Sequence, residues 1–530
     1  MRVLRRAGLL VSALGVHAAA LASCNLVVDT EVKQCESTDD CVKKGGEFAN
    51  AVCTNNVCSL GGDCSTNQEC SARFGGVPAI CRRPSRTCVQ LTTPECAEVF
   101  PVGAIAEDQT VVLGFIGPLS GPDVSSGTPA WQGVKLALNE LEVNAKGLPI
   151  RGRTDRRRLA VVACDDSGDP TVVANHLAKN VRAPLIFGPA FSSVLLDIAT
   201  KVTVPAGSLL FSFSATSPAI TDLNDNGLVW RTCPSDALQA KPMAALVADL
   251  EDQIRTEQSI PAATPIRVAM TVLGDAYGTG LANAASSLIT FNGKGAVDND
   301  TNFLRIDYDP ATSDFTTTVD AVAAQKPHLV LLIGTTETVT DLLPAIEAKL
   351  GTPKPYYVGS DGAKIQQLLD TVDANTALRT RVFGTAAGRT TQQYQAFKGR
   401  FKAFYQNQDP GTYAEHAYDA TYLAAFALVG TSDALPTGGV MNQGLGLTVQ
   451  GAPIPAGPDQ VNTAFAALLV PGGTVDYDGV SGPLDFDVQK GEAPADVDVW
   501  CINSAGKFTS SGQFYNSVTN QVEGTRNNCN

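Results

Sequence analysis

The sequence predicts an α/β fold in which parallel strands alternate with covering helices. The apolar run 111–116 breaks at the loop Gly117-Pro118-Leu119-Ser120-Gly121 and resumes as an amphipathic helix near 130–144. This pattern is typical of a buried parallel strand that feeds a crossover helix. The segments 184–188 and 208–213 repeat it, each followed by a serine-rich loop. The core is therefore expected to be α/β.

The alternation continues from residue 108 to about 515. The expected strands are 111–116, 159–164, 184–188, 208–213, 266–273, 328–333 and 355–359. The expected helices lie near 130–144, 170–181, 193–203, 236–254, 279–291, 312–325, 338–350, 363–372, 391–406 and 414–429. Such alternation implies parallel sheets covered on both faces. Because ~400 residues exceed one unit of this kind, two Rossmann-like lobes are expected.

The N-terminus predicts an exported lipoprotein. Residues 1–6 hold three arginines, residues 7–22 are small and apolar, and Leu21-Ala22-Ser23-Cys24 resembles a bacterial lipoprotein cleavage box. We expect residues 1–23 to be the signal peptide and Cys24 to become the lipidated first residue. An ordinary signal peptide or a membrane helix is the alternative, disfavoured because the apolar run is short and contains His17.

The composition and the missing motifs narrow the function. The 53 acidic and 39 basic residues give a net charge of −14, which disfavours nucleic acid and anionic membrane surfaces as partners. The sequence contains no G-x-S-x-G, no G-x-x-x-x-G-K-[ST] and no H-E-x-x-H, and its four histidines are scattered. We therefore expect a binding protein with no catalytic residue, no metal and no cofactor.

Fourteen cysteines indicate a cross-linked N-terminal region. Two modules of four follow one another with similar gaps: Cys35, Cys41, Cys53 and Cys58, then Cys64, Cys70, Cys81 and Cys88. Units this short in an exported chain are stapled by disulfides, and each module allows three connectivities. Zinc is the alternative, disfavoured because the modules lack histidine and paired C-x2-C spacing. Residues 24–107 are thus expected to form a disulfide-rich stalk.

The remaining cysteines allow two hypotheses. Cys501 could pair with Cys529 and hold the C-terminal tail, and Cys164 could pair with Cys233 near the strand ends. The state of Cys96 stays open.

The segments 111–122, 185–193 and 209–221, in this order, resemble the leucine/branched-chain amino-acid-binding proteins of ABC importers, which are type I periplasmic binding proteins. The resemblance implies lobe one at about 108–233 and 390–485, lobe two at about 234–389 and 486–515, three hinge crossings and a tail at 516–530. The ligand would lie in the cleft between the lobes, at the carboxyl ends of the strands, and hinge closure would bury it. The disulfide of better-studied members is absent, because its positions match Gly168 and Phe191.

Three residues of lobe one are expected to hold the ligand. Ser192 precedes the helix 193–202, so its hydroxyl and the free amides of that helix suit a carboxylate. Thr216 adds a hydroxyl at the next strand end, and the Ser214 carbonyl can accept from an ammonium group. The resemblance assigns these roles to the matching positions. The alternative is that the side chains only cap helices and turns.

Lobe two is expected to supply the counter-charge and a cover. Asp361 matches the acid that binds the ligand ammonium, or else it caps the helix 363–372. Tyr277 matches an aromatic cover, the alternative being an exposed tyrosine at a loop tip. Thr335 and Ser126 stand where relatives often have aromatic residues, and an aspartate replaces the usual glutamate. These departures leave the identity of the ligand open.

Together these observations predict a lipid-anchored extracytoplasmic solute receptor in the periplasm or on the surface of a bacterium. Its ligand would be an amino acid or a related carboxylate, and its partner an ABC permease. The membrane would be reached through the anchor alone. The alternative is a sensory or adhesive surface lipoprotein whose cysteine modules bind a partner.

Overall fold

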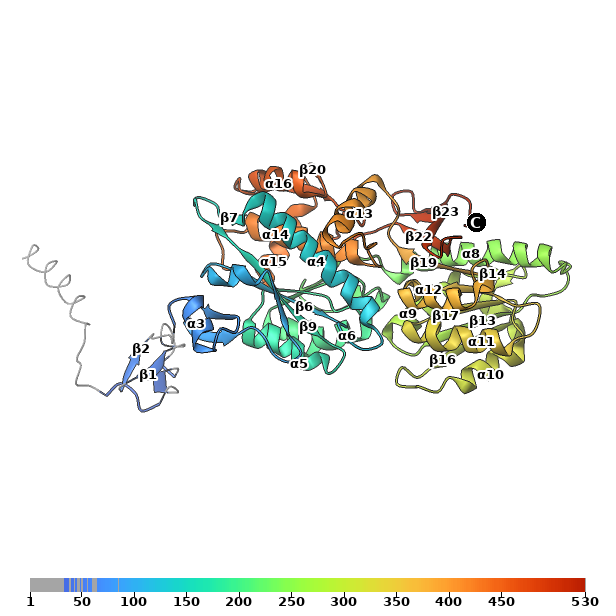
Figure 1. Cartoon of the computed structure of the whole chain (residues 1–530), viewed down its shortest axis with the longest axis horizontal. Coiled ribbons are helices and arrows are strands. Elements are labelled where there is room, and N and C mark those ends of the chain that lie inside the picture. The colour runs from blue at the N-terminus through green and yellow to red at the C-terminus, as the bar shows by residue number, and fades with distance from the viewer. Residues whose placement is uncertain are drawn as a thin grey trace, which may run out of the picture.

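The computed structural model describes residues 33–529 except for 38–39, 42, 45–47, 49–50, 55, 60–63 and 84. The predicted signal peptide and Cys24 lie outside this part of the chain. Within it, two small cysteine modules precede two α/β lobes arranged in line (Figure 1). Among the described residues, no helix combines the length and apolar character needed to cross a bilayer.

Lobe one is built on a six-stranded sheet in the order β12-β11-β10-β6-β9-β5, parallel except for β5. Its strands are β5 Glu98–Phe100, β6 Val111–Gly117, β9 Leu159–Asp165, β10 Leu185–Phe187, β11 Leu209–Ser212 and β12 Val229–Arg231. All seven residues of β6 are buried, because helices cover both faces of the sheet.

The helices of lobe one form two layers around this sheet. One layer contains α4 Val124–Ala145, α13 Gln392–Phe404, α14 Ala414–Gly430, α15 Gly438–Leu445 and α16 Val461–Leu468. The other contains η2 Val102–Ala106, α5 Pro170–Asn175, η3 His176–Val181, α6 Ser192–Ile198, η4 Ala199–Thr203 and α7 Val204–Ala206. Helix α14 is buried along its whole length, even at Glu415, His416 and Asp419, and it is the central helix of the first layer.

Lobe two is built on an eight-stranded sheet in the order β16-β13-β17-β18-β19-β22-β23-β24. Its strands are β13 Val268–Leu273, β16 Phe303–Tyr308, β17 Leu329–Ile333, β18 Tyr356–Gly359, β19 Val382–Ala387, β22 Val497–Ile502, β23 Phe508–Asn516 and β24 Gln521–Glu523. Its main helices are α8 Asp236–Glu257, α9 Ala276–Leu288, α10 Thr316–Gln325, η8 Thr338–Leu342, α11 Leu343–Lys349 and α12 Gln366–Ala374. The first five strands of the sheet are parallel, and the three C-terminal strands add antiparallel.

Three chain segments cross between the lobes: β12 to α8, β19 to α13, and the stretch before β22. The predicted α/β class with two lobes and a disulfide-rich N-terminal region is confirmed. The third crossing lies later than residue 486, because Phe486 and Ala493 pack in the lobe-one core. The stretch beyond residue 515 is also part of lobe two, since it contributes β24.

Each cysteine module is stapled in the same way, first cysteine to third and second to fourth. The bonds are Cys35–Cys53, Cys41–Cys58, Cys64–Cys81 and Cys70–Cys88. Two groups of three cysteine sulfurs lie within 4.8 Å, but all of these sulfurs belong to disulfides and are not free thiolates for a metal. The first module contains β1 Val52–Thr54 and β2 Val57–Ser59; the second contains α3 Asn67–Arg73, β3 Ala79–Arg82 and β4 Thr87–Gln90.

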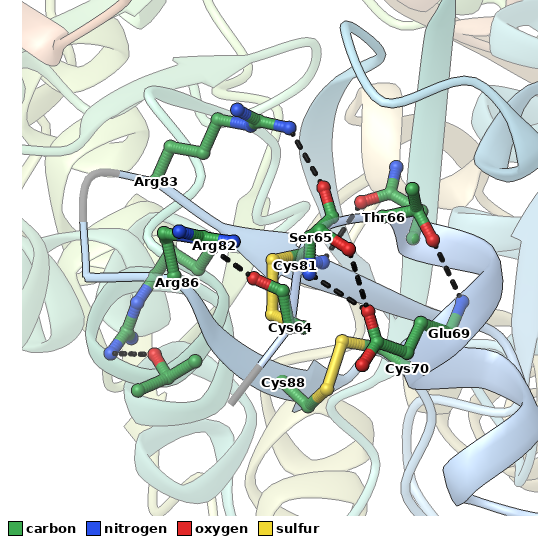
Figure 2. The surroundings of a disulfide bond; sticks show 12 residues. Cys64, Ser65, Thr66, Glu69, Cys70, Cys81, Arg82, Arg83, Arg86 and Cys88 are labelled. Atoms are coloured by element: carbon green, nitrogen blue, oxygen red, sulfur yellow. Dashed lines mark hydrogen bonds between the residues drawn. A yellow bond between two sulfur atoms is a disulfide. The ribbon is translucent and has the colours of Figure 1, made fainter. Parts of the chain in front are cut away.

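The second module docks on lobe one. Figure 2 shows its two disulfides: Cys70 of α3 bonds to Cys88 of β4, and Cys64, just before α3, bonds to Cys81 of β3. The backbone N–H of Asn67 donates to Asp108 at 2.7 Å, its side-chain amide donates to the Glu107 carbonyl, and Arg82 donates to the Asn180 carbonyl. Ile80 packs against the lobe-one core. This module is therefore an extension of lobe one.

The chain also enters lobe one before residue 108, where the stalk was expected to end. Strand β5 pairs antiparallel with β9, and Cys96 forms a disulfide with Cys164 at the end of β9. The hypothesis of a Cys164–Cys233 bond is therefore wrong, and Cys233 is a buried free thiol. The Cys501–Cys529 hypothesis is confirmed.

Candidate functional site

A cavity lies between the lobes, where the carboxyl ends of the parallel strands meet. Its empty space, including the part that is open to solvent, is about 480 Å³. Five of the six ligand-binding residues expected from the sequence line it: Ser192, Ser214, Tyr277, Thr335 and Asp361. The cavity therefore lies at the position of the binding site that the sequence predicts.

Lobe one contributes a hydroxyl at the start of a helix. Ser192 is the first residue of α6 and is 1% exposed. Its Oγ accepts the Ser217 backbone N–H at 3.1 Å, so its own proton is free to donate. Ser214 lines the cavity and donates its hydroxyl proton to the Ala190 carbonyl at 2.9 Å.

Thr216 lies behind the cavity wall. It is fully buried, and its carbonyl accepts the backbone N–H of Asp236 at 2.9 Å. Its Oγ1 has no hydrogen-bond partner among the described residues. Thr216 therefore faces the junction between the lobes.

Asp361 is the anionic group of the cavity. It is 4% exposed and accepts three hydrogen bonds, from Tyr277 Oη at 2.6 Å, Gln239 Nε2 at 2.9 Å and Tyr413 Oη at 2.6 Å. It does not cap a helix, because α12 begins at Gln366 with Ile365 in the capping position. The capping alternative is wrong, and the carboxylate faces the cleft.

Two tyrosines from opposite lobes hold this carboxylate. Tyr277 begins α9 in lobe two and is buried, so it is not an exposed loop-tip residue. Tyr413 comes from lobe one, just before α14, with a left-handed φ of 68°. Burial and the charge of Asp361 raise the pKa of both phenols, so both stay protonated and donate. A left-handed backbone is uncommon in a bulky residue such as tyrosine, and it is found mainly at functional sites, where it sets the direction of the side chain.

Sequence reasoning missed Asp236, a second buried acid. It is the first residue of α8, fully buried, and neither carboxylate oxygen has a hydrogen-bond partner among the described residues. Burial raises its pKa, and the negative charge of nearby Asp361 raises it further, while the neighbouring Thr216 side chain and the Arg231 cation offset part of the shift. Nothing in its local sequence distinguishes it from the ordinary acid in the first turn of a helix.

The lobes are closed over the cavity. Ser193 donates to Asp275 at 3.1 Å, Ser217 to the Ala276 carbonyl at 2.7 Å, and Gln367 to the Pro122 carbonyl at 3.2 Å. Each of these bonds joins lobe one to lobe two. These contacts hold the two lobes together over the cavity.

Residues 110–506 match the periplasmic binding protein family, over more than half of the chain. The chain belongs to this family. Among curated proteins, it is 35% identical over 147 residues to the chemotactic signal transduction system substrate-binding protein BasB of Halobacterium salinarum. It is also 28% identical over 177 residues to an amino acid binding protein of Pseudomonas aeruginosa. These matches cover 27% and 33% of this chain, and 34% and 42% of the two relatives.

Solved structures share the fold at low identity. The branched-chain amino acid transporter substrate-binding protein LivJ of Streptococcus pneumoniae, in complex with isoleucine, has a TM-score of 0.57 at 19% identity, covering 78% of this chain and 100% of LivJ. The leucine-binding protein LivK of Thermotoga maritima has a TM-score of 0.56 at 15% identity, covering 76% and 97%. A solute-binding protein of R. palustris, in complex with 4-hydroxybenzoate, has a TM-score of 0.55 at 13% identity, covering 79% and 98%. The predicted resemblance is confirmed for family and fold.

Proposed function

We propose that this protein is a lipid-anchored extracytoplasmic receptor that binds a small amino acid in its interlobe cleft and delivers it to an ABC permease. The observation that carries the proposal is the buried carboxylate of Asp361 in the cavity wall, with a second buried acid, Asp236, close behind it. None of the described residues that line the cavity is lysine, arginine or histidine. Because buried charges require a partner, the ligand supplies the positive charge. We also propose that the protein releases its ligand without changing it chemically.

The carboxylate of the ligand binds at lobe one. The Ser192 hydroxyl proton is free, and the first N–H groups of α6 have no partner within that helix and would bind an anion beside it. Isoleucine and 4-hydroxybenzoate, the ligands of two structural relatives, both carry a carboxylate. This chemistry supports the role expected for Ser192.

The ammonium of the ligand binds at Asp361. Its three hydrogen-bond donors are Gln239, Tyr277 and Tyr413, all neutral groups, so the ligand ammonium would be its cationic partner. Asp236 lies close enough for its pKa to respond to Asp361, and an ammonium group between the lobes would stabilise the charged form of both acids. A ligand with an amino group is favoured over a simple carboxylate for this reason.

This arrangement predicts that ligand affinity rises with pH. The raised pKa of Asp236 means that the empty site binds a proton that the ammonium group displaces. Binding therefore releases protons, and the dissociation constant falls as pH rises, by up to about tenfold per pH unit while Asp236 titrates. Calorimetry between pH 5 and 8 measures this slope. Asp236→Asn is expected to flatten it; an unchanged slope in that variant would assign the proton to another group.

The anchor is tested at Cys24. Cys24→Ser is expected to abolish acylation and move the protein from the membrane fraction to the soluble fraction, because no acyl chain then holds it. Mass spectrometry of the mature N-terminus, with fractionation of cells, measures both effects. An unmodified Cys24 in a membrane-bound wild-type protein would contradict the anchor.

The function itself is tested by identifying the ligand. Native mass spectrometry of the purified protein, followed by calorimetry with amino acids and simple carboxylates, is expected to find one small amino acid that binds 1:1. Tight binding of a carboxylate without an amino group, at unchanged affinity in Asp361→Ala, would show that the ligand class is wrong.

A sensory role is the second candidate, and one observation favours it. BasB, a relative by sequence, is the substrate-binding protein of a chemotactic signal transduction system. A signalling receptor would also close on its ligand, but the closed form would be recognised by a signal transducer and not by a permease. Cross-linking in cells separates the two roles, because an importer subunit captures a permease and a sensor captures a signalling protein.

A further inference from the structure

Most of the hydroxyl groups that line the cavity already donate their proton in a hydrogen bond to another group of the protein. Tyr277 and Tyr413 donate to Asp361. Thr335 donates to the Glu337 carboxylate at 2.6 Å, and Thr412 donates to the Lys364 carbonyl at 2.6 Å. A hydroxyl has a single proton, so each of these groups offers the ligand only lone pairs.

The acceptors outnumber the donors that a plain amino acid carries. Its ammonium group has three N–H donors, and these are needed at the Asp361 end of the site. Thr335 of lobe two and Thr412 of lobe one remain as further acceptors among the lining residues. If the ligand side chain were aliphatic, each hydroxyl would keep the hydrogen bond that it donates, but its lone pairs would lose water on closure and gain no donor. A side chain with its own O–H or N–H donor removes that penalty.

Charge limits the side chain further. A second carboxylate is disfavoured, because it would face lone pairs without a cation among the lining residues.

We propose that the ligand is a small amino acid whose side chain donates a hydrogen bond, of the serine or threonine class. This inference rests on the proposed function and names its substrate class. Ser125 and Ser126 on α4 also line the cavity, and the Oγ of Ser125 is buried without a partner among the described residues. The Ser125 hydroxyl can either donate a hydrogen bond to the ligand hydroxyl or accept one from it. Ile365 and Phe191 provide the apolar contact for a methyl group.

The test is calorimetry of the purified full chain with matched ligand pairs. Threonine and valine have the same shape and differ by a hydroxyl for a methyl. Threonine is expected to bind about 2- to 10-fold more tightly than valine, and serine more tightly than alanine, because the ligand hydroxyl adds one net hydrogen bond to these acceptors. Equal affinities, or tightest binding of leucine or isoleucine, would overturn the inference and leave the proposed function standing. Failure of every amino acid to bind would overturn both.

Variants locate the acceptor. Thr335→Val and Thr412→Val keep the side-chain shape and remove the lone pairs, so at least one should bring the threonine-to-valine ratio close to one while valine binding stays or improves. Thr371→Val is the matched control, since Thr371 donates to the Val339 carbonyl and does not line the cavity. An unchanged ratio in both cavity variants would overturn the assignment. The wild-type ratio stands as a test even if a variant fails to fold.

Discussion

Asp361→Asn is expected to weaken amino acid binding at least ~30-fold with little loss of fold stability. Losing one partner of a buried, charge-assisted pair typically costs ~2 to 5 kcal/mol of binding free energy. Asparagine keeps the size of the side chain but removes the charge, and its amide group meets the donors Tyr277 and Tyr413. Calorimetry with the cognate amino acid measures the effect.

The control is Asp373→Asn, the same change at an exposed position at the end of α12 in the same lobe. It should leave affinity unchanged. A second measurement separates charge from structure: a ligand analogue that lacks the amino group should bind the wild type and Asp361→Asn about equally. If Asp361→Asn binds the amino acid as tightly as the wild type does, the ammonium site lies elsewhere.

The parallel core could be predicted because its strands are buried on both faces. Segments such as 111–116 and 328–333 are continuous apolar runs, and both appear as β6 and β17. Strand β16 was missed because it is the edge strand of its sheet and carries Arg305 and Asp307. Its half-exposed pattern is weaker than that of a central strand.

The site could be predicted in part. Ser192 and Asp361 directly follow buried strands, where the topology of open α/β sheets places ligands. Tyr413 and Asp236 could not be found in this way. Tyr413 caps α14, a helix that follows no strand, and Asp236 comes close to Asp361 only because the crossing after β12 places the start of α8 there. Their roles depend on how the lobes close.

The length of the stalk was overestimated for a similar reason. Cysteine spacing indicates where a chain is cross-linked by disulfides, but not which surface the cross-linked module packs against. The second module buries Ile80 on lobe one, and β5 completes the sheet of that lobe. These contacts join segments far apart in the sequence, and no local pattern reports them.

The second large effect is expected at the hinge, where Arg231 ties three segments together. Arg231 ends β12 and is 1% exposed. Its guanidinium donates to the carbonyls of Ala215 and Ser217, at 3.3 and 2.9 Å, and pairs with Glu492, which precedes the third crossing. The loop it holds contains Thr216 and donates the Ser217 N–H to Ser192. Arg231 therefore joins the binding loop to two of the three crossings.

Arg231→Met is expected to lower the free energy of unfolding of lobe one by ~3 to 5 kcal/mol, because it leaves Glu492 and two buried carbonyls without their cation. Denaturation followed by tryptophan fluorescence measures this, since Trp230 adjoins the mutated residue. Arg305→Met is the matched control, because the Arg305–Asp307 pair is 26% and 40% exposed and should contribute about 0 to 1 kcal/mol. The double variant Arg231→Met/Glu492→Met should recover part of the loss by removing the orphaned carboxylate. If Arg231→Met is as stable as Arg305→Met, the hinge is held by its apolar packing, and the ion pair has no part in positioning the binding loop.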